Sequence, residues 1–245
     1  MNDLTLLTCN FNTPYLIDGL LKSLIKTSST LPNVLVMDTS TDESCVVPDY
    51  IPSFRFAGGI HGEAVNLAFK KIKTRYVLLV DSDILFLQDY KKPFEVFKKE
   101  GGVAMGKVVG DVAGKSLYPR IEPWYCFLDL SVLSRSKISF FDALRTSNSK
   151  QSGRVYDIGS TMFEDLNNRG MKILDVNLEN KYFKHYGGMS WHIFKFDPSQ
   201  KDTDVDFGGT HPHQALHAHG RMVLDMYNKD IAEYSNINIK ETFEL

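Results

Sequence analysis

The sequence predicts an α/β fold with a Rossmann-like, mostly parallel sheet flanked by helices, on three observations. Short apolar runs rich in β-branched and aromatic residues recur in the first half of the chain, as buried strands require. Segments with apolar residues at helical spacing lie between these runs. A length of 245 residues with 43% hydrophobic residues suffices for a full core. Strands separated by helices pair in parallel through right-handed crossovers, which gives this fold class.

The first hundred residues contain the regular alternation. The expected elements, in order, are a strand at 4–9, a helix at 14–26, strands at 33–37 and 54–57, a helix at 62–73 and a strand at 76–80. Pro14 suits the first turn of its helix, because no intrahelical bond uses the backbone N–H at that position. In the second helix the apolar residues Val65, Ala68, Phe69 and Ile72 share one face. The chain therefore begins as a β-α-β unit.

The second half is less regular, as expected of a region built on loops. Its expected elements are strands at 103–109, 124–130 and 172–176, a helix at 158–168 and a helix from 213 or 214 to 227. Gly170 suits the end of the first of these helices. Because no clear linker, repeat or low-complexity segment interrupts the pattern, we expect one domain over residues 1–245.

Charge and cysteine content exclude several classes of partner. The formal net charge is −2, so the chain as a whole does not attract the phosphate backbone of nucleic acids. Three widely spaced cysteines, Cys9, Cys45 and Cys126, suit buried thiols in a reducing compartment better than a disulfide framework. The sequence begins without a basic and then apolar leader, and no apolar stretch approaches membrane-spanning length. We therefore expect a cytoplasmic protein without a membrane span.

The acidic pair Asp81 and Asp83, separated by Ser82, follows directly after the apolar run at 76–80. Such a run forms a short buried strand, and α/β folds bind ligands at the carboxyl edge of the sheet. Two carboxylates so close together repel each other unless a cation or protons compensate. Hard divalent cations that carry phosphate oxygens prefer carboxylate ligands. The simpler alternative is that these residues only form a turn after the strand. The sequence thus predicts a metal site here.

Several motifs in this order resemble those of GT-A glycosyltransferases, particularly family-2-like enzymes. The motifs are Asn10-Phe-Asn-Thr-Pro14, Asp38-Thr-Ser40, Gly62 with Asn66, Asp81-Ser-Asp83 and His185-Tyr-Gly-Gly-Met-Ser190. The resemblance covers roughly residues 3 to 190 and implies a metal-dependent transfer of a sugar from a nucleotide-sugar donor to a hydroxyl acceptor. It implies a nucleotide-sugar-binding half at 1–105, an acceptor and catalytic half at 106–195, and a C-terminal tail with a helix at 196–245.

The resemblance also implies roles for individual residues. The expected donor-binding residues are Thr8, Asn10, Asp38, Asn66, Asp81 and Ser82, and the expected metal ligands are Asp81, Asp83 and His185. Asp38 would accept a hydrogen bond from the base, which fits the ring N–H of uridine and favours a UDP-sugar, although thymidine offers the same group and guanosine a comparable one. A shell of carboxylates and imidazole favours Mn²⁺ over Mg²⁺. His185 has a structural alternative as a backbone-bonded histidine, and His192 is its nearest competitor as ligand.

The chain departs from the family pattern in two places. Family members often have Arg before the Asn of the helix that precedes the acidic pair, and Val65 occupies that position here. They also carry a Glu-Asp pair at a characteristic distance before a helix-ending Gly, with the Asp acting as base. Asp157 has approximately that spacing from Gly170, so we expect it to be the base of an inverting transfer. The alternative role of Asp157 is that of a helix N-cap.

Acceptor binding and two other functions complete the expectations. Trp124, Tyr125 and Trp191 have flat apolar rings that suit the carbon–hydrogen face of a sugar, although large aromatics are more often core. A sugar nucleotidyltransferase is one alternative, but it would need a glycine-rich phosphate loop after the first strand, where residues 9–14 contain no glycine. A non-catalytic carbohydrate-binding protein is the other, since fold does not fix function.

Overall fold

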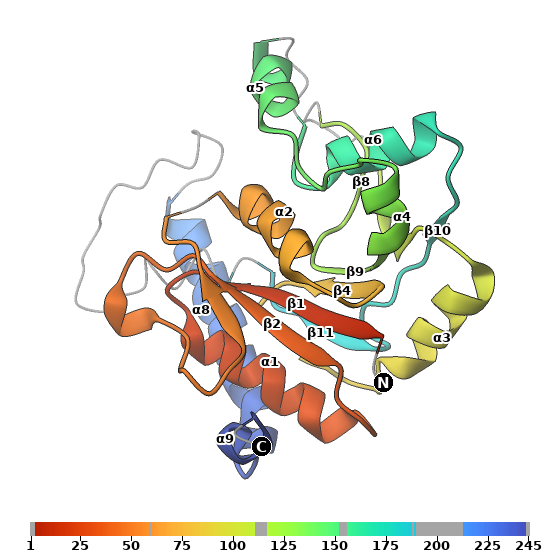
Figure 1. Cartoon of the computed structure of the whole chain (residues 1–245). Helices are drawn as coiled ribbons and strands as arrows, with labels where there is room; N and C mark the ends of the chain where they lie inside the picture. Colours follow the sequence, from red (N-terminus) through yellow and green to blue (C-terminus); the bar gives the residue numbers. More distant parts are fainter. Residues whose placement is uncertain are drawn as a thin grey trace.

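A seven-stranded sheet with the order β10-β6-β9-β4-β1-β2-β3 forms the centre of the molecule (Figure 1). The computed structural model describes residues 3–58, 60–110, 117–151, 156–187, 189 and 213–243. The strands are β1 (Leu4–Asn10), β2 (Asn33–Asp38), β3 (Ser53–Arg55), β4 (Tyr76–Val80), β6 (Ala104–Gly106), β9 (Tyr125–Asp129) and β10 (Ile173–Asp175). The predicted strands are thus confirmed, most of them to within two residues at each end.

Strand direction confirms the mostly parallel sheet. β1 pairs in parallel with β2 and β4, β2 with β3, and β10 with β6, whereas β9 is antiparallel to both β4 and β6. The helices α1 (Pro14–Thr27) and α2 (His61–Lys71) lie between the parallel strands in the sequence, as predicted. The carboxyl ends of β1, β2 and β4 therefore meet at one edge of the sheet, where the site lies.

Helices cover both faces of the sheet (Figure 1). One face packs against α1 and α3 (Lys91–Glu100), and the other packs against α2, α4 (Leu130–Arg135) and α6 (Ser160–Asn168). The alternation of strand side chains explains the two layers: Leu78 and Val80 point to the first face, and Val77 and Leu79 to the second. Both faces are buried at the centre of the sheet, so the central strand β4 is buried along its whole length.

Two short strand pairs that the sequence did not predict complete the region around the site. β5 (Ile84–Phe86) pairs antiparallel with β11 (Phe183–His185), and β7 (Val108–Val109) pairs antiparallel with β8 (Arg120–Ile121). Pairings this short depend on partners far away in the sequence, and a window of three residues carries no periodicity. They determine which distant side chains meet.

The C-terminal part of the chain packs against the first helix. The predicted helix at 213–227 is confirmed as α8 (His213–Ile231), with α9 (Ile239–Phe243) after it and α5 (Ala143–Gln151) before α6. A Cβ atom at Gly19 of α1 would lie 1.9 Å from the Tyr227 hydroxyl, so glycine permits this close approach. In the part of the chain that the structure describes, no helix is both long enough and apolar enough to cross a bilayer.

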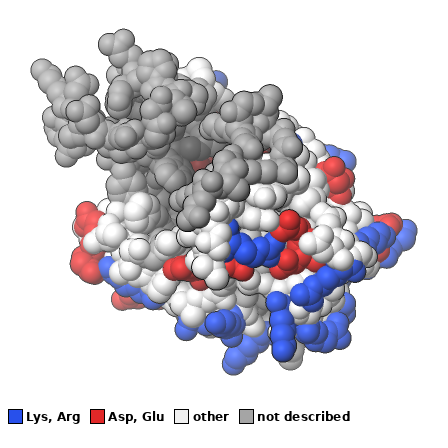
Figure 2. All heavy atoms as spheres, turned by 90° about the horizontal axis from the view of Figure 1, so that it is seen from above, with Lys and Arg blue, Asp and Glu red and all other residues white. Residues whose placement is uncertain are grey.

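Charged side chains on one face are shown in Figure 2, which views the molecule from above. Lys and Arg collect toward one margin of this face, with Asp and Glu among them. This mixture agrees with the net charge of −2 and gives no support for a nucleic-acid partner.

Candidate metal centre

The strand pair β5–β11 brings His185 to the acidic pair. β4 ends at Val80, the chain turns through Asp81 and Ser82, and β5 begins at Ile84. In the antiparallel register His185 lies opposite Ile84, at the point where the turn enters β5. Residues from two distant parts of the sequence therefore converge at the carboxyl edge of the sheet.

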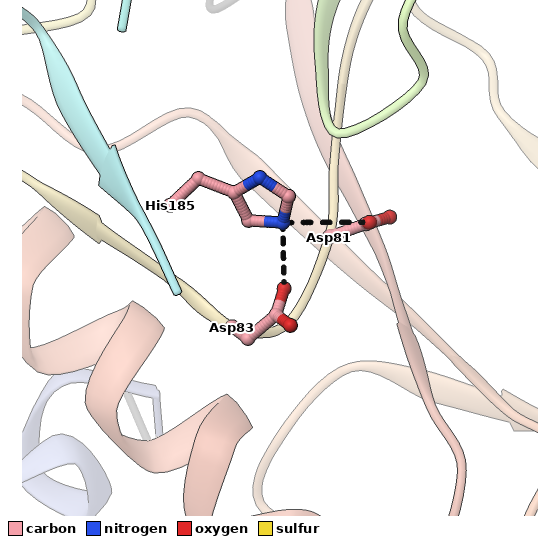
Figure 3. Close-up of side chains that lie close together, drawn as sticks. All are labelled: Asp81, Asp83 and His185. Atoms are coloured by element: carbon pink, nitrogen blue, oxygen red, sulfur yellow. Dashed lines mark ion pairs between the residues drawn. The ribbon is translucent and has the colours of Figure 1, made fainter. Parts of the chain in front are cut away.

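The imidazole of His185 faces both carboxylates (Figure 3). Its Nε2 lies 3.2 Å from Oδ1 of Asp83 and 4.0 Å from Oδ2 of Asp81. One ligand atom from each residue lies within 4.8 Å of the others. Both His185 Nε2 and Asp83 Oδ1 are buried and, apart from this contact with each other, have no hydrogen-bond partner among the described residues. Buried polar atoms without partners are costly, and a divalent cation between them would satisfy all three residues.

Electrostatics at the cluster reflect its excess negative charge. Burial, together with the nearby Asp83 carboxylate, raises the pKa of Asp81 to about 7. Burial by itself lowers the pKa of His185, but Asp83 and Asp81 outweigh it and the net shift is upward. Without a cation, protons are the only positive charges that these three residues can gather. A bound divalent cation would replace those protons, which is the behaviour expected of metal ligands.

Backbone contacts hold the Asp83 carboxylate and the main chain of Asp81 in place. Oδ2 of Asp83 accepts a hydrogen bond from the Met189 amide at 3.1 Å, and its carbonyl accepts one from the Tyr186 amide at 2.9 Å. The Asp81 amide donates to the Trp124 carbonyl at 3.2 Å. These bonds join the turn after β4 to the segments that follow β11 and precede β9. The ligand geometry is thus set before any ligand binds.

Of the aromatic residues expected to bind the acceptor, only Trp124 is placed at the site. Its ring centroid lies 4.8 Å from that of His185, at an interplanar angle of 33°, so it packs against the imidazole. The expectation for Tyr125 is wrong: it is 2% exposed and stacks on Phe183 within the core. Neighbouring strand residues point to opposite faces, which separates these two rings. Trp191, like the competing ligand His192, lies outside the described residues.

Two expected donor-binding residues, Asn10 and Asp38, form hydrogen bonds within the protein. Both are almost completely buried. Oδ1 of Asp38 accepts hydrogen bonds from the Asn10 side chain and the Ser40 amide, and Oδ2 accepts one from the Val47 amide. The Asn10 side chain also bonds to Ser40, Cys45 and Thr13. The carboxylate is enclosed and shapes the loop that follows β2, and the expected hydrogen bond from a base to Asp38 stays a prediction.

The other expected donor-binding residues are Thr8, Asn66 and Ser82. Thr8 is fully buried within β1, its hydroxyl oxygen has no hydrogen-bond partner among the described residues, and its contact with a nucleotide stays a prediction. The Asn66 amide donates to the Phe141 carbonyl at 2.6 Å and its oxygen accepts from the Phe140 amide at 2.9 Å, so its role at the donor also stays a prediction. Asn66 ties the segment after α4 to α2. Ser82 is 4% exposed, and its contact with the donor stays a prediction.

Asp157, the expected base, lies before α6 and is 45% exposed. It is not the N-cap of α6: that position belongs to Gly159, which has a positive φ of 83°. One oxygen of Asp157 accepts from the Ile158 amide, and the other lies 3.4 Å from the Arg120 guanidinium. Arg120 in turn pairs with Glu122 at 3.2 Å. Sequence reasoning missed Arg120 and Glu122, because neither belongs to a motif and both depend on long-range packing.

Comparison with solved structures places this arrangement among known folds. The chain aligns with S. aureus TarS 1-349 in complex with UDP at 18% identity and a TM-score of 0.50, covering 99% of this chain and 77% of that one. It aligns with glucosyl-3-phosphoglycerate synthase from Mycobacterium tuberculosis at 14% identity and a TM-score of 0.52, covering 94% and 80%. The chain has a GT-A fold. The sequence-based resemblance is thereby confirmed for the fold.

The GT-A fold of this chain is also found in a different class of enzyme. A Bacillus anthracis protein described as a glucose-1-phosphate thymidylyltransferase aligns at 12% identity and a TM-score of 0.50, covering 92% of this chain and 99% of that one. A longer TarS structure aligns at 17% identity and a TM-score of 0.49, and this chain spans 43% of its length. No protein-family model matches the sequence, and no curated protein matches it either. The site itself must therefore decide the function.

Proposed function

We propose that this protein is a metal-dependent glycosyltransferase that moves a sugar from a nucleotide-sugar donor to a hydroxyl of a glycan or another acceptor. The observation that carries this proposal is the cluster of Asp81, Asp83 and His185 at the carboxyl edge of a GT-A sheet. Two buried atoms of this cluster have no hydrogen-bond partner outside it among the described residues. A UDP-sugar is the favoured donor. The support is the structural likeness to TarS, which binds UDP and UDP-GlcNAc.

The residues of the cluster suit a divalent cation, and Mn²⁺ is the favoured one. Two carboxylates and one imidazole form a mixed oxygen and nitrogen ligand set, which Mg²⁺ accepts less readily than Mn²⁺ does. M. tuberculosis glucosyl-3-phosphoglycerate synthase has been solved with Mn²⁺, UDP-glucose and phosphoglyceric acid, at a TM-score of 0.50 to this chain. A bound cation would stabilise the negative charge that develops on the diphosphate leaving group.

We assign Asp157 as the base of an inverting transfer. A base must reach the acceptor hydroxyl and take its proton as the new bond forms, so it needs an exposed oxygen. Asp157 is 45% exposed, and its contact with Arg120 orients the carboxylate. Burial raises the pKa values of Glu122 and Asp81; the charge of Asp157 adds to the rise at Glu122, and the charge of Glu122 adds to the rise at Asp81.

A sugar nucleotidyltransferase remains the second candidate, because the B. anthracis structure has the same type of fold. Nucleotidyltransferases of this type would need a phosphate-cradling glycine loop after β1. Residues 9–14 contain no glycine, and the side chain of Asn10 in this segment is enclosed by Asp38 and Ser40. The glycosyltransferase therefore fits this chain better than the nucleotidyltransferase.

The test is incubation with a panel of nucleotide sugars and Mn²⁺. Release of the nucleoside diphosphate, by hydrolysis or by transfer to added glycans, supports the glycosyltransferase. Pyrophosphate-dependent exchange into the nucleotide sugar would instead establish the nucleotidyltransferase. If neither reaction occurs while a nucleotide sugar binds, the protein is a non-catalytic binding module.

Asp157→Asn tests the chemistry separately from binding. The amide keeps the shape of the carboxylate but cannot accept the proton, so turnover should fall roughly 100-fold or more while donor affinity is unchanged. Asp142→Asn is the matched control, because Asp142 bonds to a backbone amide at the start of α5 and takes no part in the proposed chemistry. Near-normal turnover of Asp157→Asn under donor saturation would overturn the assignment of the base.

A further inference from the structure

Beside the metal cluster lies a second pair of buried charges with unpaired atoms, Arg120 and Glu122. The Glu122 side chain is 4% exposed and that of Arg120 is 12% exposed. Oε1 of Glu122 accepts a hydrogen bond from Arg120 at 3.2 Å, but Oε2 has no hydrogen-bond partner. One terminal guanidinium nitrogen of Arg120 is likewise buried without a hydrogen-bond partner, and it lies 3.4 Å from Asp157.

A buried carboxylate oxygen without a partner is unfavourable, and most such groups in native proteins are satisfied. Burial raises the pKa of Glu122, although Arg120 acts in the opposite direction. A second carboxylate and arginine pair in the same protein shows the usual arrangement. Asp129, also buried, accepts hydrogen bonds from Arg75, Ser131 and Val132, so neither of its oxygens is left unpaired. The unpaired oxygen of Glu122 therefore indicates a missing partner rather than a general feature of buried ion pairs.

Glu122 is placed next to the metal cluster by the backbone. Its amide donates to the Lys107 carbonyl at 2.9 Å, and two residues later the Trp124 carbonyl accepts from the Asp81 amide. The ring of Trp124 packs on His185. The charge of Glu122 also acts on Asp81. The unpaired oxygen thus lies in the neighbourhood of the atoms that would hold the diphosphate of a donor.

Close packing of α6 on β8 holds the pair against Asp157. A Cβ atom at Gly159 would lie 3.0 Å from the Ile121 carbonyl, so glycine permits this close approach. The positive φ at this position also favours glycine. Ile121 lies between Arg120 and Glu122 in the chain. The contact therefore holds the segment that carries Asp157 close to β8, which contains Arg120 and directly precedes Glu122.

We propose that Arg120 and Glu122 form a recognition site for a sugar hydroxyl, in which Oε2 of Glu122 accepts a hydrogen bond from the hydroxyl. This inference rests on the proposed function. Carboxylates are strong acceptors, and a buried acceptor discriminates strongly against a ligand that lacks the matching hydroxyl. Arg120 opposes the rise in the pKa of Glu122 that burial causes, and it contacts both Glu122 and Asp157. The hydroxyl belongs either to the donor sugar or to the acceptor sugar, and binding measurements distinguish these sources.

The experiment uses the full chain with Mn²⁺ and calorimetry. In Glu122→Gln the second oxygen becomes an amide donor, so a ligand hydroxyl loses its charged acceptor while the side-chain volume is kept. If the hydroxyl belongs to the donor, affinity for the preferred UDP-sugar should fall about 10-fold or more and affinity for UDP should stay unchanged. If it belongs to the acceptor, donor affinity should be unchanged. Binding of methyl hexopyranosides to the complex with UDP and Mn²⁺ should then fall by the same factor.

Controls separate this inference from folding and from the proposed function. Asp129→Asn removes a buried carboxylate with a full set of partners, so it should lower the melting temperature and leave sugar affinity unchanged, whereas Glu122→Gln should leave the melting temperature unchanged or raise it. Glu122→Ala serves as a second variant if the glutamine variant does not fold. Wild-type affinities for both the UDP-sugar and the methyl hexopyranosides in Glu122→Gln would overturn this inference alone. Failure of the wild-type protein to bind any nucleotide sugar would overturn both.

Discussion

Polar residues at the carboxyl edge of the sheet form two groups that differ in their hydrogen bonding. Asn10 and Asp38, at the ends of β1 and β2, bond to each other and to the loop after β2, and they are closed to solvent. Around the end of β4, by contrast, buried atoms of Asp83, His185 and Glu122 have no hydrogen-bond partner among the described residues, apart from the contact between Asp83 and His185. An unpaired buried polar atom is costly, and a ligand at the end of β4 would supply partners for these three residues. The first group therefore builds the frame, and we propose that the second group binds the ligand.

The largest effect is expected at the binding group. Asp83→Ala removes a cluster residue, so Mn²⁺-dependent binding of UDP should be lost, with an affinity decrease of roughly 100-fold or more. Calorimetry with and without Mn²⁺ measures this. Asp83→Asn, which can still accept the hydrogen bond from Met189, separates loss of the charge from loss of the turn. Wild-type affinity for UDP and Mn²⁺ in both variants would show that Asp83 is not a metal ligand.

The frame should respond in the opposite way. Asp38→Ala deprives the Ser40 and Val47 amides and the Asn10 side chain of their acceptor inside the protein. Each buried donor left unpaired costs about 1 kcal/mol or more, so the free energy of unfolding should fall by about 3 kcal/mol. Urea denaturation measures this loss. Mn²⁺ affinity of the folded fraction should be unchanged, and a selective loss of nucleotide affinity with normal stability would place Asp38 at the donor site.

The stability of the binding group should also depend on pH. Asp81 and His185 both have raised pKa values in the folded protein, that of Asp81 at about 7. Protons thus bind the folded state more tightly than the unfolded state. This contribution to stability is complete below the unfolded pKa of Asp81 and is lost as the pH rises through about 7. In EDTA, the melting temperature should therefore fall over this range relative to that of Asp81→Asn.

Mn²⁺ should reverse this trend, because it competes with the same protons. The increase in melting temperature on adding Mn²⁺ should be larger at pH 8 than at pH 5.5. Thermal unfolding in matched buffers with EDTA or Mn²⁺ measures both trends. An increase that does not depend on pH would show that the ion binds elsewhere.

A smaller effect is expected from the residue that holds β11 in place. Asp230 of α8 accepts from Lys184 at 2.5 Å and from the Tyr186 hydroxyl at 2.5 Å, so it contacts the residues on both sides of His185. Asp230→Asn should weaken this contact and lower Mn²⁺ affinity a few-fold, less than the roughly 10- to 100-fold effect of residues that bond directly to metal ligands. UDP binding at saturating Mn²⁺ should recover to the wild-type value, whereas a general folding defect would not be rescued by the metal.

Local sequence patterns determined the sheet and the place of the acidic pair. The run Tyr76–Val80 forms β4 with the predicted limits, and Asp81 and Asp83 follow it, because apolar β-prone residues and the turn after them are neighbours in the chain. The β-α-β beginning and the order of its elements follow in the same way. For His185 the motif resemblance was needed, because the residues alone did not separate it from His192.

Only the tertiary structure decided which polar groups are left for a ligand. A sequence shows that Asn10 and Asp38 end strands, but not that Ser40, Cys45 and Val47 occupy their hydrogen bonds. Nor does it show that β5 and β11 pair and bring His185 to Asp83. Arg120 and Glu122 were missed for the same reason. Hydrogen-bond satisfaction depends on contacts between distant segments, whereas the periodicity that predicts strands and helices is a property of adjacent residues.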